Sequence, residues 1–373
     1  MTELNLTELE WLAVRAGINV ADGHARQEPT SAQQKIISRL PDLFVQAATE
    51  SEAMIDRDAQ SAFLSALGQQ RALTDAEVLT CYSSSVALEI LGRSLLAVAA
   101  RRVAMIHPTF DNIPDLLRGV GAQLVPIPEE QLVDGSARLP TGTDVLFCTT
   151  PNNPTGKVLS RDVLAYWAHV CARRGIVLGL DTSFRGFDVS AQYDHYKVLA
   201  EAGCRYVVIE DTGKLWPTLD LKVGLLVFSR HLAVPLRRVY TDILLGVSPF
   251  ILLLVRQFAE DAAAGGLKEL HRFVAHNRAL LRNHLGTAAL PDPASRISVA
   301  RVAVPVGSSA TTMSRELRRT GVHVLPCRQF HWAAPEEGEH YIRVALGRRP
   351  EVVDEAAATI RDFLAQADRS VRR

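Results

Sequence analysis

The chain alternates short apolar runs with longer stretches of helical periodicity. Apolar runs typical of buried strands occur at 103–106, 123–127, 145–148, 176–180, 206–209 and 223–228. Helical patterns cover 113–118 and 161–173, a helix opens on the serine cluster 83–85, and another pattern runs from 249 to about 264. Strands that are apolar throughout and alternate with helices predict an α/β fold whose mostly parallel sheet is covered on both faces.

The two ends of the chain follow other patterns. Residues 6–14 have helical periodicity, with Thr7 as the expected cap and Glu10 three residues later, the spacing of a capping box. Residues 21–27 are polar and loop-like, and helical patterns dominate 33–67. Near the other end, Gly265-Gly266 ends the helical pattern that begins at 249. We therefore expect an N-terminal arm or lid at 1–36, a large domain at 37–264 and a smaller α+β domain at 265–373. An arm with few apolar anchors is expected to close over the substrate and exclude water.

Composition narrows the class of protein. The 373 residues hold 41 basic and 41 acidic side chains, so no net charge attracts nucleic acid or an anionic membrane. Five scattered cysteines without a C-x-x-C pair fit buried thiols in a reducing cytoplasm rather than disulfides or a metal site. The acidic N-terminus lacks a secretory signal, and the apolar stretch at 251–255 is too short to span a bilayer. We expect a cytoplasmic protein.

Polar clusters follow several predicted strands. The turn at 149–156 reads T-T-P-N-N-P-T-G, Asp181 follows one strand, and Asp211 and Lys214 follow another. Ligands of open α/β sheets bind at the carboxyl ends of strands. The serines at 83–85 open a helix, where backbone N–H groups hold anions. A carboxylate, a lysine, an asparagine and an anion cradle suggest a phosphorylated cofactor held as a Schiff base.

The order and spacing of these clusters, over roughly 80–350, resemble the fold type I pyridoxal-phosphate enzymes of the aspartate aminotransferase family. That fold has a large domain with a seven-stranded type of sheet and a smaller α+β domain. The motif P-N-N-P-T-G at 151–156 implies that Asn153 bonds the cofactor phenolic oxygen and the substrate carboxylate. Asp181 matches the partner of the pyridinium nitrogen, and Lys214 matches the lysine that carries the cofactor.

The same resemblance assigns the rest of the cofactor and carboxylate site. Phe110 matches the aromatic residue that stacks on the ring, and Ser84 and Ser85 match the phosphate cup. Arg343 matches the arginine that takes the α-carboxylate as a bidentate pair. Ser183, two residues after Asp181, is also expected to bind the cofactor.

Three positions depart from the family pattern. Phe184 stands where a tyrosine is usual, and Lys222 stands where a phosphate-binding arginine is usual. Asp211 replaces a phosphate-binding serine. A carboxylate beside a phosphate requires a cation. A guanidinium or ammonium group of the substrate, Lys222 or a structural arginine could each supply it.

Longer strings narrow the resemblance to the oxygen-using pyridoxal-phosphate L-arginine oxidases and hydroxylases. The strings that carry it lie at 23–27, 81–85, 181–188, 209–217 and 326–332. This resemblance implies that L-arginine and dioxygen give 4-hydroxy-2-oxo-5-guanidinopentanoate and the simple 2-oxo acid, with ammonia and hydrogen peroxide, for guanidino natural products. It implies no metal and no flavin, and analogy suggests a homodimer or a dimer of dimers.

The resemblance also implies roles in the arginine chemistry. Lys214 would remove the α-proton, and His24 would activate or position the water that adds at the γ-carbon. Thr7, Glu10 and Asp211 would reach the guanidinium, since a planar cation favours carboxylate partners.

Two other functions compete with this one. An arginine:2-oxo-acid aminotransferase would use the same Lys214 but pass the amino group to a second oxo acid. A cofactor-binding transcription regulator would need a basic DNA-binding domain, and residues 1–36 are too short and too acidic to supply it. The sequence leaves open the partition between hydroxylated and merely oxidised product.

Overall fold

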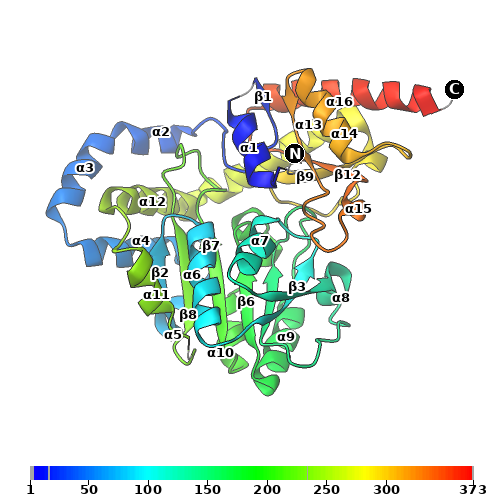
Figure 1. The fold of residues 1–373 in the computed structure, drawn as a ribbon. Helices are drawn as coiled ribbons and strands as arrows, with labels where there is room; N and C mark the ends of the chain where they lie inside the picture. The colour runs from blue at the N-terminus through cyan, green and yellow to red at the C-terminus, as the bar shows by residue number, and fades with distance from the viewer. Residues whose placement is uncertain (1–3, 16, 233, 372–373) are drawn as a thin grey trace.

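A seven-stranded sheet forms the centre of the described chain, a computed structural model that covers residues 4–15, 17–232 and 234–371 (Figure 1). Its pairs are parallel except for those that β8 makes with β7 and β2. The strands, in spatial order, are β2 (Ala76–Cys81), β8 (Gly224–Ser229), β7 (Tyr206–Asp211), β6 (Val177–Asp181), β5 (Val145–Thr149), β3 (Arg102–His107) and β4 (Gln123–Pro128).

Both faces of this sheet are buried. Val103 and Met105 belong to the core under α6 (Ser84–Ala97), α7 (Asn112–Gly119) and α11 (Leu236–Ile243). Ala104 and Ile106 belong to the core on the other face, which includes residues of α4 (Glu52–Ala66), α9 (Arg161–Arg174), α10 (His195–Glu201) and α12 (Pro249–Asp261). The predicted α/β class with a mostly parallel sheet is confirmed.

One strand is absent from the predicted set. β2 (Ala76–Cys81) includes Glu77 and Thr80, and two of its residues are only half-buried, because it forms the edge of the sheet and pairs with β8 alone. An edge strand does not need the continuous apolar run that reveals a central strand.

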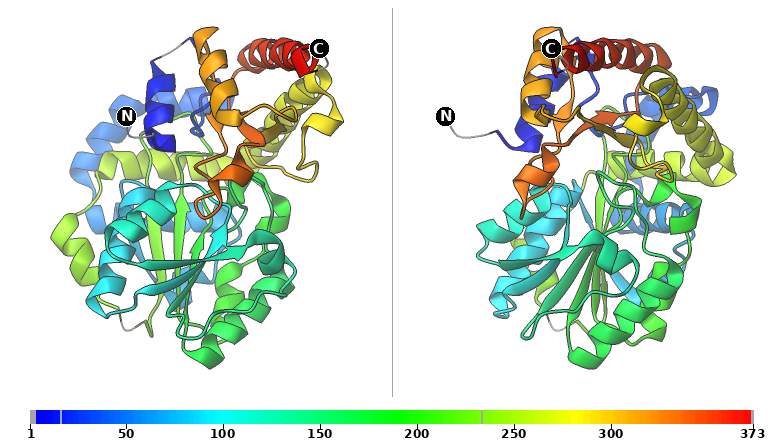
Figure 2. Two further views of the ribbon diagram at one scale, coloured as in Figure 1. Left: turned by 45° about the vertical axis from the view of Figure 1, so that its right-hand side comes forward. Right: turned by 90° about the vertical axis from the view of Figure 1, so that its right-hand side faces the viewer.

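A second, antiparallel sheet of three strands lies beside the first, in the order β11 (Leu325–Pro326), β12 (Tyr341–Ala345) and β9 (Val299–Ala303). It is accompanied by α13 (Leu267–Leu285), α14 (Ala310–Arg319), α15 (Pro335–Gly338) and α16 (Pro350–Val371). Both views in Figure 2 show α16 lying across α13 above the central sheet. The expected helix break is real, since Gly265 has a φ of 129° between α12 and α13. The chain nevertheless stays helical through 262–266, so the boundary at 264 stays a prediction.

The N-terminal segment contacts both the C-terminal part of the chain and the start of α7. β1 (Ile18–Asn19) pairs in parallel with β10 (Val322–His323). At the start of α1 (Leu6–Val14), the Leu6 N–H donates to Asp111 Oδ2 at 2.8 Å. The remaining helices are α2 (Ser31–Ser38), α3 (Leu40–Thr49), α5 (Ala72–Asp75) and α8 (Glu129–Val133). No helix within the described ranges is both long and apolar enough to cross a bilayer.

The predicted capping box of α1 is wrong. Asn5 caps the helix by accepting from the Glu8 N–H at 2.8 Å, and Glu8 accepts from the Asn5 N–H at 2.8 Å. The helix therefore begins two residues earlier than a Thr7 cap requires, because Asn5 and Glu8 satisfy the same motif. Glu10 does not take part in capping and lies on the buried side of α1.

Candidate active site

A cavity of about 360 Å³ opens where the parallel strands of the central sheet end. Every residue predicted for catalysis, cofactor binding or substrate binding contributes to its wall. These residues are Thr7, Glu10, His24, Ser84, Ser85, Phe110, Asn153, Asp181, Ser183, Asp211, Lys214, Lys222 and Arg343.

Asp181 ends β6 inside this cavity. Its Oδ1 accepts from the Ser183 backbone N–H at 2.9 Å and from the Ser183 hydroxyl at 2.6 Å. Burial raises the pKa of the Asp181 carboxyl to about 6, although the two Ser183 bonds and Lys214 lower it. A carboxyl that is this costly to ionise gains from a cationic partner in the cavity.

Asp211 ends β7 and is held in its ionised form. Burial raises its pKa, but the charges of Lys214 and Lys222 and a 2.6 Å bond from the Ser84 hydroxyl leave it below its ordinary value. The charges of Lys222, one of the alternatives left open, and of Lys214, which was not among them, thus stabilise the Asp211 carboxylate. Ser84, predicted to bind phosphate, donates to Asp211 in this structure.

The start of α6 forms an anion cradle. Ser83 caps the helix by accepting from the Val86 N–H at 3.2 Å, which leaves the backbone N–H groups of 84 and 85 at the helix terminus. A Cβ on Gly224 would lie 2.5 Å from the Ser83 carbonyl carbon, so glycine lets β8 approach the helix start.

Arg343, on β12, is buried and already paired. Its guanidinium donates to Glu10 Oε1 at 2.9 Å, to Asn153 Oδ1 at 3.4 Å and to the Ala21 carbonyl. The Phe330 ring centroid lies 5.3 Å from the Arg343 Cζ. Glu10 also accepts from the Gly23 N–H at 3.3 Å, so α1 and the loop that follows it meet at this arginine.

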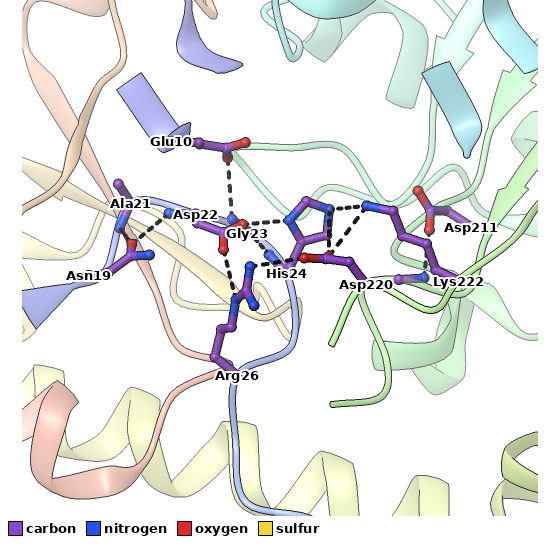
Figure 3. A network of polar contacts seen from close by, with 12 residues as sticks. Glu10, Asn19, Ala21, Asp22, Gly23, His24, Arg26, Asp211, Asp220 and Lys222 are labelled. Carbon is purple, nitrogen blue, oxygen red and sulfur yellow. Dashed lines mark hydrogen bonds and ion pairs between the residues drawn. The ribbon is translucent and has the colours of Figure 1, made fainter. Parts of the chain in front are cut away.

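His24 stands in a chain of polar contacts shown in Figure 3. Its Nδ1 lies 2.6 Å from Asp22 Oδ1, and its Nε2 lies 2.6 Å from Lys222 Nζ. Burial raises the pKa of Asp22, but the His24 hydrogen bond and the charge of Arg348 hold it well below its usual range. Because ionised Asp22 can only accept, Nδ1 carries the hydrogen and the Nε2 lone pair faces Lys222.

The sequence analysis missed two residues of this network of polar contacts. Asp22 orients His24, and Asp220 lies 3.6 Å from Lys222 Nζ. An aspartate two residues before a histidine in a glycine-containing loop was the available signal for Asp22. Phe184, noted in place of a tyrosine, does line the cavity and is almost fully buried.

A comparison with models of protein families identifies the family of this chain. The model of aminotransferase class I and II matches residues 17–360. The chain belongs to this family. It therefore has the aminotransferase-like fold type I, and its cofactor is pyridoxal 5'-phosphate.

The relatives of this aminotransferase-family chain divide into distant and near. An LL-diaminopimelate aminotransferase of Nitratidesulfovibrio vulgaris is 25% identical over 260 residues, which cover 65% of this chain and 64% of the relative. An aromatic amino acid aminotransferase of Cutibacterium acnes is 27% identical over 50% of this chain and 53% of its own length. The matches thus span between half and two thirds of these relatives.

A solved structure of MppP soaked with the product 2-ketoarginine is much more similar. It is 52% identical with a TM-score of 0.89, and the match covers 93% of this chain and 99% of MppP. An aminotransferase from Mycobacterium tuberculosis, 20% identical with a TM-score of 0.77 over 98% of this chain and 97% of its own, shows the shared fold alone.

The donor set of the cavity fits pyridoxal phosphate. The N-terminus of α6 can take a phosphate, and Lys214 Nζ has no hydrogen-bond partner among the described residues. A Cβ on Gly213, next to that lysine, would lie 2.4 Å from the Lys222 Cδ, so the turn that carries Lys214 leaves no room for a side chain there. Asp181, with its raised pKa, offers an acceptor for a protonated ring nitrogen.

Proposed function

We propose that this protein is a pyridoxal-phosphate-dependent, oxygen-consuming oxidase and hydroxylase of L-arginine. Its products would be 4-hydroxy-2-oxo-5-guanidinopentanoate and 2-oxo-5-guanidinopentanoate, with ammonia and hydrogen peroxide. The observation that carries the proposal is the 52% identity, over 93% of this chain, with MppP, a protein whose solved structure was soaked with the product 2-ketoarginine. We also propose that the enzyme acts in the cytoplasm, in the biosynthesis of guanidino natural products.

The Glu10–Arg343 pair supports an arginine substrate. In this structure the Glu10 carboxylate and the Arg343 guanidinium bind each other at 2.9 Å in the cavity wall. L-arginine carries both of these groups, so it can replace the pair. Its carboxylate would take Arg343 and Asn153, and its guanidinium would take Glu10, with Thr7 and Asp211 nearby.

The cavity residues of this protein would then each have a role around the reacting carbon. Bound pyridoxal phosphate supplies an electron-withdrawing ring that accepts the electron pair left when the α-proton is removed. Asp181 would keep the ring nitrogen protonated, with Ser183 fixing its Oδ1. Ser84, Ser85 and Lys222 would hold the phosphate, and Lys214 Nζ would take the α-proton after releasing the cofactor to the substrate.

The remaining residues would set the course of the reaction. Phe110 would stack on the ring. His24 Nε2, whose lone pair is fixed by Asp22, would take a proton from the water that adds at the γ-carbon. The arm would exclude bulk water from that step, since α1 lies over the cavity and contributes Thr7 and Glu10 to its wall. The oxygen of the new hydroxyl would then come from water.

The test is mass spectrometry of the products of L-arginine in air and oxygen-18 water. We expect a 4-hydroxy product labelled at the 4-position and oxygen uptake without any added oxo acid. Borohydride reduction followed by peptide mapping should place the cofactor on Lys214. The Lys214→Ala variant should carry no covalently attached cofactor after the same treatment. An unlabelled hydroxyl group, or arginine consumption that requires an oxo acid, would contradict the proposal.

The second candidate is an arginine:2-oxo-acid aminotransferase. It is favoured by the curated relatives, which are aminotransferases at 25–27% identity. This activity would convert pyruvate to alanine at the expense of arginine, with no oxygen uptake. The two reactions are separated by the same experiment when it is repeated with and without pyruvate.

A further inference from the structure

Two histidines and a glutamate meet outside the cavity wall. His107 is the last residue of β3, His331 lies in the loop 327–334, and Glu337 lies in α15. One nitrogen of each ring and one carboxylate oxygen all lie within 4.8 Å of one another. His331 Nδ1 is 3.4 Å and His107 Nε2 is 3.8 Å from Glu337 Oε2.

Both imidazoles are buried, and apart from the approaches to Glu337 at 3.4 and 3.8 Å their nitrogens lack hydrogen bonds in the described chain. His107 is 9% exposed and His331 is 5% exposed, and none of their four ring nitrogens has a hydrogen-bond partner in the described part of the chain. Buried polar atoms are nearly always paired, so four unpaired nitrogens in two touching rings require an explanation. Packing holds the rings in place, because they meet edge to face at 5.3 Å and Trp332 packs on His107 at 5.6 Å.

The chemistry of this group suits a late first-row metal ion. Neutral imidazole is the form that binds metal, and two buried rings held beside a carboxylate are placed to supply it. Two imidazoles and one carboxylate with an open position match a three-ligand zinc site. We propose that His107, His331 and Glu337 bind a zinc ion, with water as the fourth ligand.

The required movement is small. A tetrahedral zinc ion with bonds of about 2.0–2.2 Å holds its ligand atoms about 3.3 Å apart. The observed separations exceed this by less than about 1.5 Å. The side chain of Glu337 is 62% exposed, so its carboxylate can swing toward the two rings, which are fixed by packing.

The ion would fasten the loop 327–334 to the central sheet. Two hydrogen bonds already join them, from the Thr109 N–H to the Phe330 carbonyl at 3.0 Å and from Trp332 Nε1 to the Ile106 carbonyl at 3.0 Å. Phe330 packs against Phe110, a cavity residue, with ring centroids 5.7 Å apart. The zinc ion would therefore brace one wall of the cavity and take no part in the reaction itself.

The test uses tag-free holoenzyme that has been stripped with a chelator and titrated with zinc sulfate against a competing chelator. We expect one zinc per chain and a higher Tm. His107→Gln and His331→Gln should each weaken zinc binding by at least about 100-fold, since even outer residues of zinc sites cost up to that much. His284→Gln is the matched control, because His284 pairs with the exposed Asp354 at 2.7 Å, and it should change nothing.

Zinc-edge X-ray absorption on the wild-type protein checks the ligands without any substitution. It should show two imidazole nitrogens and oxygen ligands. Failure to bind one equivalent, equal binding by His331→Gln, or an oxygen-only shell would each overturn the proposal. A buried water bridging the two rings would then explain the unpaired nitrogens.

Discussion

His24 shows how a single side chain acquires a defined protonation role from its neighbours. The Asp22 carboxylate fixes the hydrogen on Nδ1, and the Lys222 ammonium approaches the lone pair on Nε2. The same ammonium lowers the pKa of Asp211. If Lys222 turns toward the cofactor phosphate, Nε2 becomes free to accept a proton from water. His24 thus contacts Asp22 and Lys222, and Lys222 in turn links it to Asp211.

The residue-scale prediction concerns Asp22, which lies outside the cavity lining but orients His24. We expect His24→Ala to lower formation of the 4-hydroxy product by roughly 10²-fold, the usual contribution of a general base, while oxygen uptake continues. Asp22→Asn should lower it less, because the amide oxygen can still accept from Nδ1. Loss of the carboxylate charge removes a stabiliser of the imidazolium, so the pH profile of hydroxylation should shift to lower pH. Product ratios measured by mass spectrometry across pH check this.

Asp220→Asn is the matched control for this charge change. Asp220 is 4.0 Å from His24 Nε2 and its side chain is 44% exposed, so its influence is screened by solvent. We expect a smaller shift of the pH profile than with Asp22→Asn. Equal profiles for wild type and Asp22→Asn would remove Asp22 from its positioning role.

At the scale of elements, α1 is held by a buried carboxyl at the start of α7. The Leu6 N–H donates to Asp111 Oδ2, while Asp111 Oδ1 is buried without a partner in the described chain. Burial raises the pKa of Asp111 to about 7, although the hydrogen bond from the Leu6 N–H lowers it, and the charges of Asp115 and Glu10 also raise it. The arm is therefore docked on a group that is costly to ionise.

This contact predicts a pH-dependent stability. The folded pKa of Asp111 lies near 7 and its ordinary value is 3.8, so the native state binds more protons between these values and stability falls as pH rises through that window. Asp111→Asn keeps an acceptor for Leu6 and removes the charge. The variant should gain roughly 2 kcal/mol over wild type between pH 5.5 and pH 8.

Urea unfolding of the cofactor-free protein at both pH values measures this gain. Asp162→Asn, at an exposed carboxyl in the first turn of α9, is the control and should show no such pH-dependent difference. A gain for Asp111→Asn that is the same at both pH values would contradict the raised pKa.

At the scale of the whole molecule, features set by local pattern could be predicted and features set by distant contacts could not. The central strands are continuous apolar runs, and the turn at 149–156 is specified by its own prolines and glycine, so both were predictable. The edge strand at Glu77 lacks such a run. The pairing of Glu10 with Arg343 joins residues 333 positions apart and depends on how the arm folds back, which no local pattern encodes. The cation beside Asp211 was undecided for another reason: Lys214 and Lys222 are near in sequence, but the direction of a long lysine side chain is set by the fold.

The last prediction is that two chains associate through α3 and α4. Phe44, Val45 and Met54 are 67%, 63% and 60% exposed on these consecutive helices, so three large apolar side chains are left in water there. Burying these side chains in a dimer would remove them from water. By analogy with other fold type I enzymes, whose sites usually lie at a dimer interface, we also expect association to be needed for activity.

Light scattering should give a mass of two chains of 40.9 kDa, or four, for the wild type. Phe44→Glu combined with Val45→Glu places two like charges in the contact and should give single chains with reduced arginine oxidation. Val306→Glu, at a residue that is 92% exposed in the loop after β9, is the control and should stay associated and active. A single-chain mass for the wild type, or an unchanged mass for the double variant, would show that this apolar surface is not the contact.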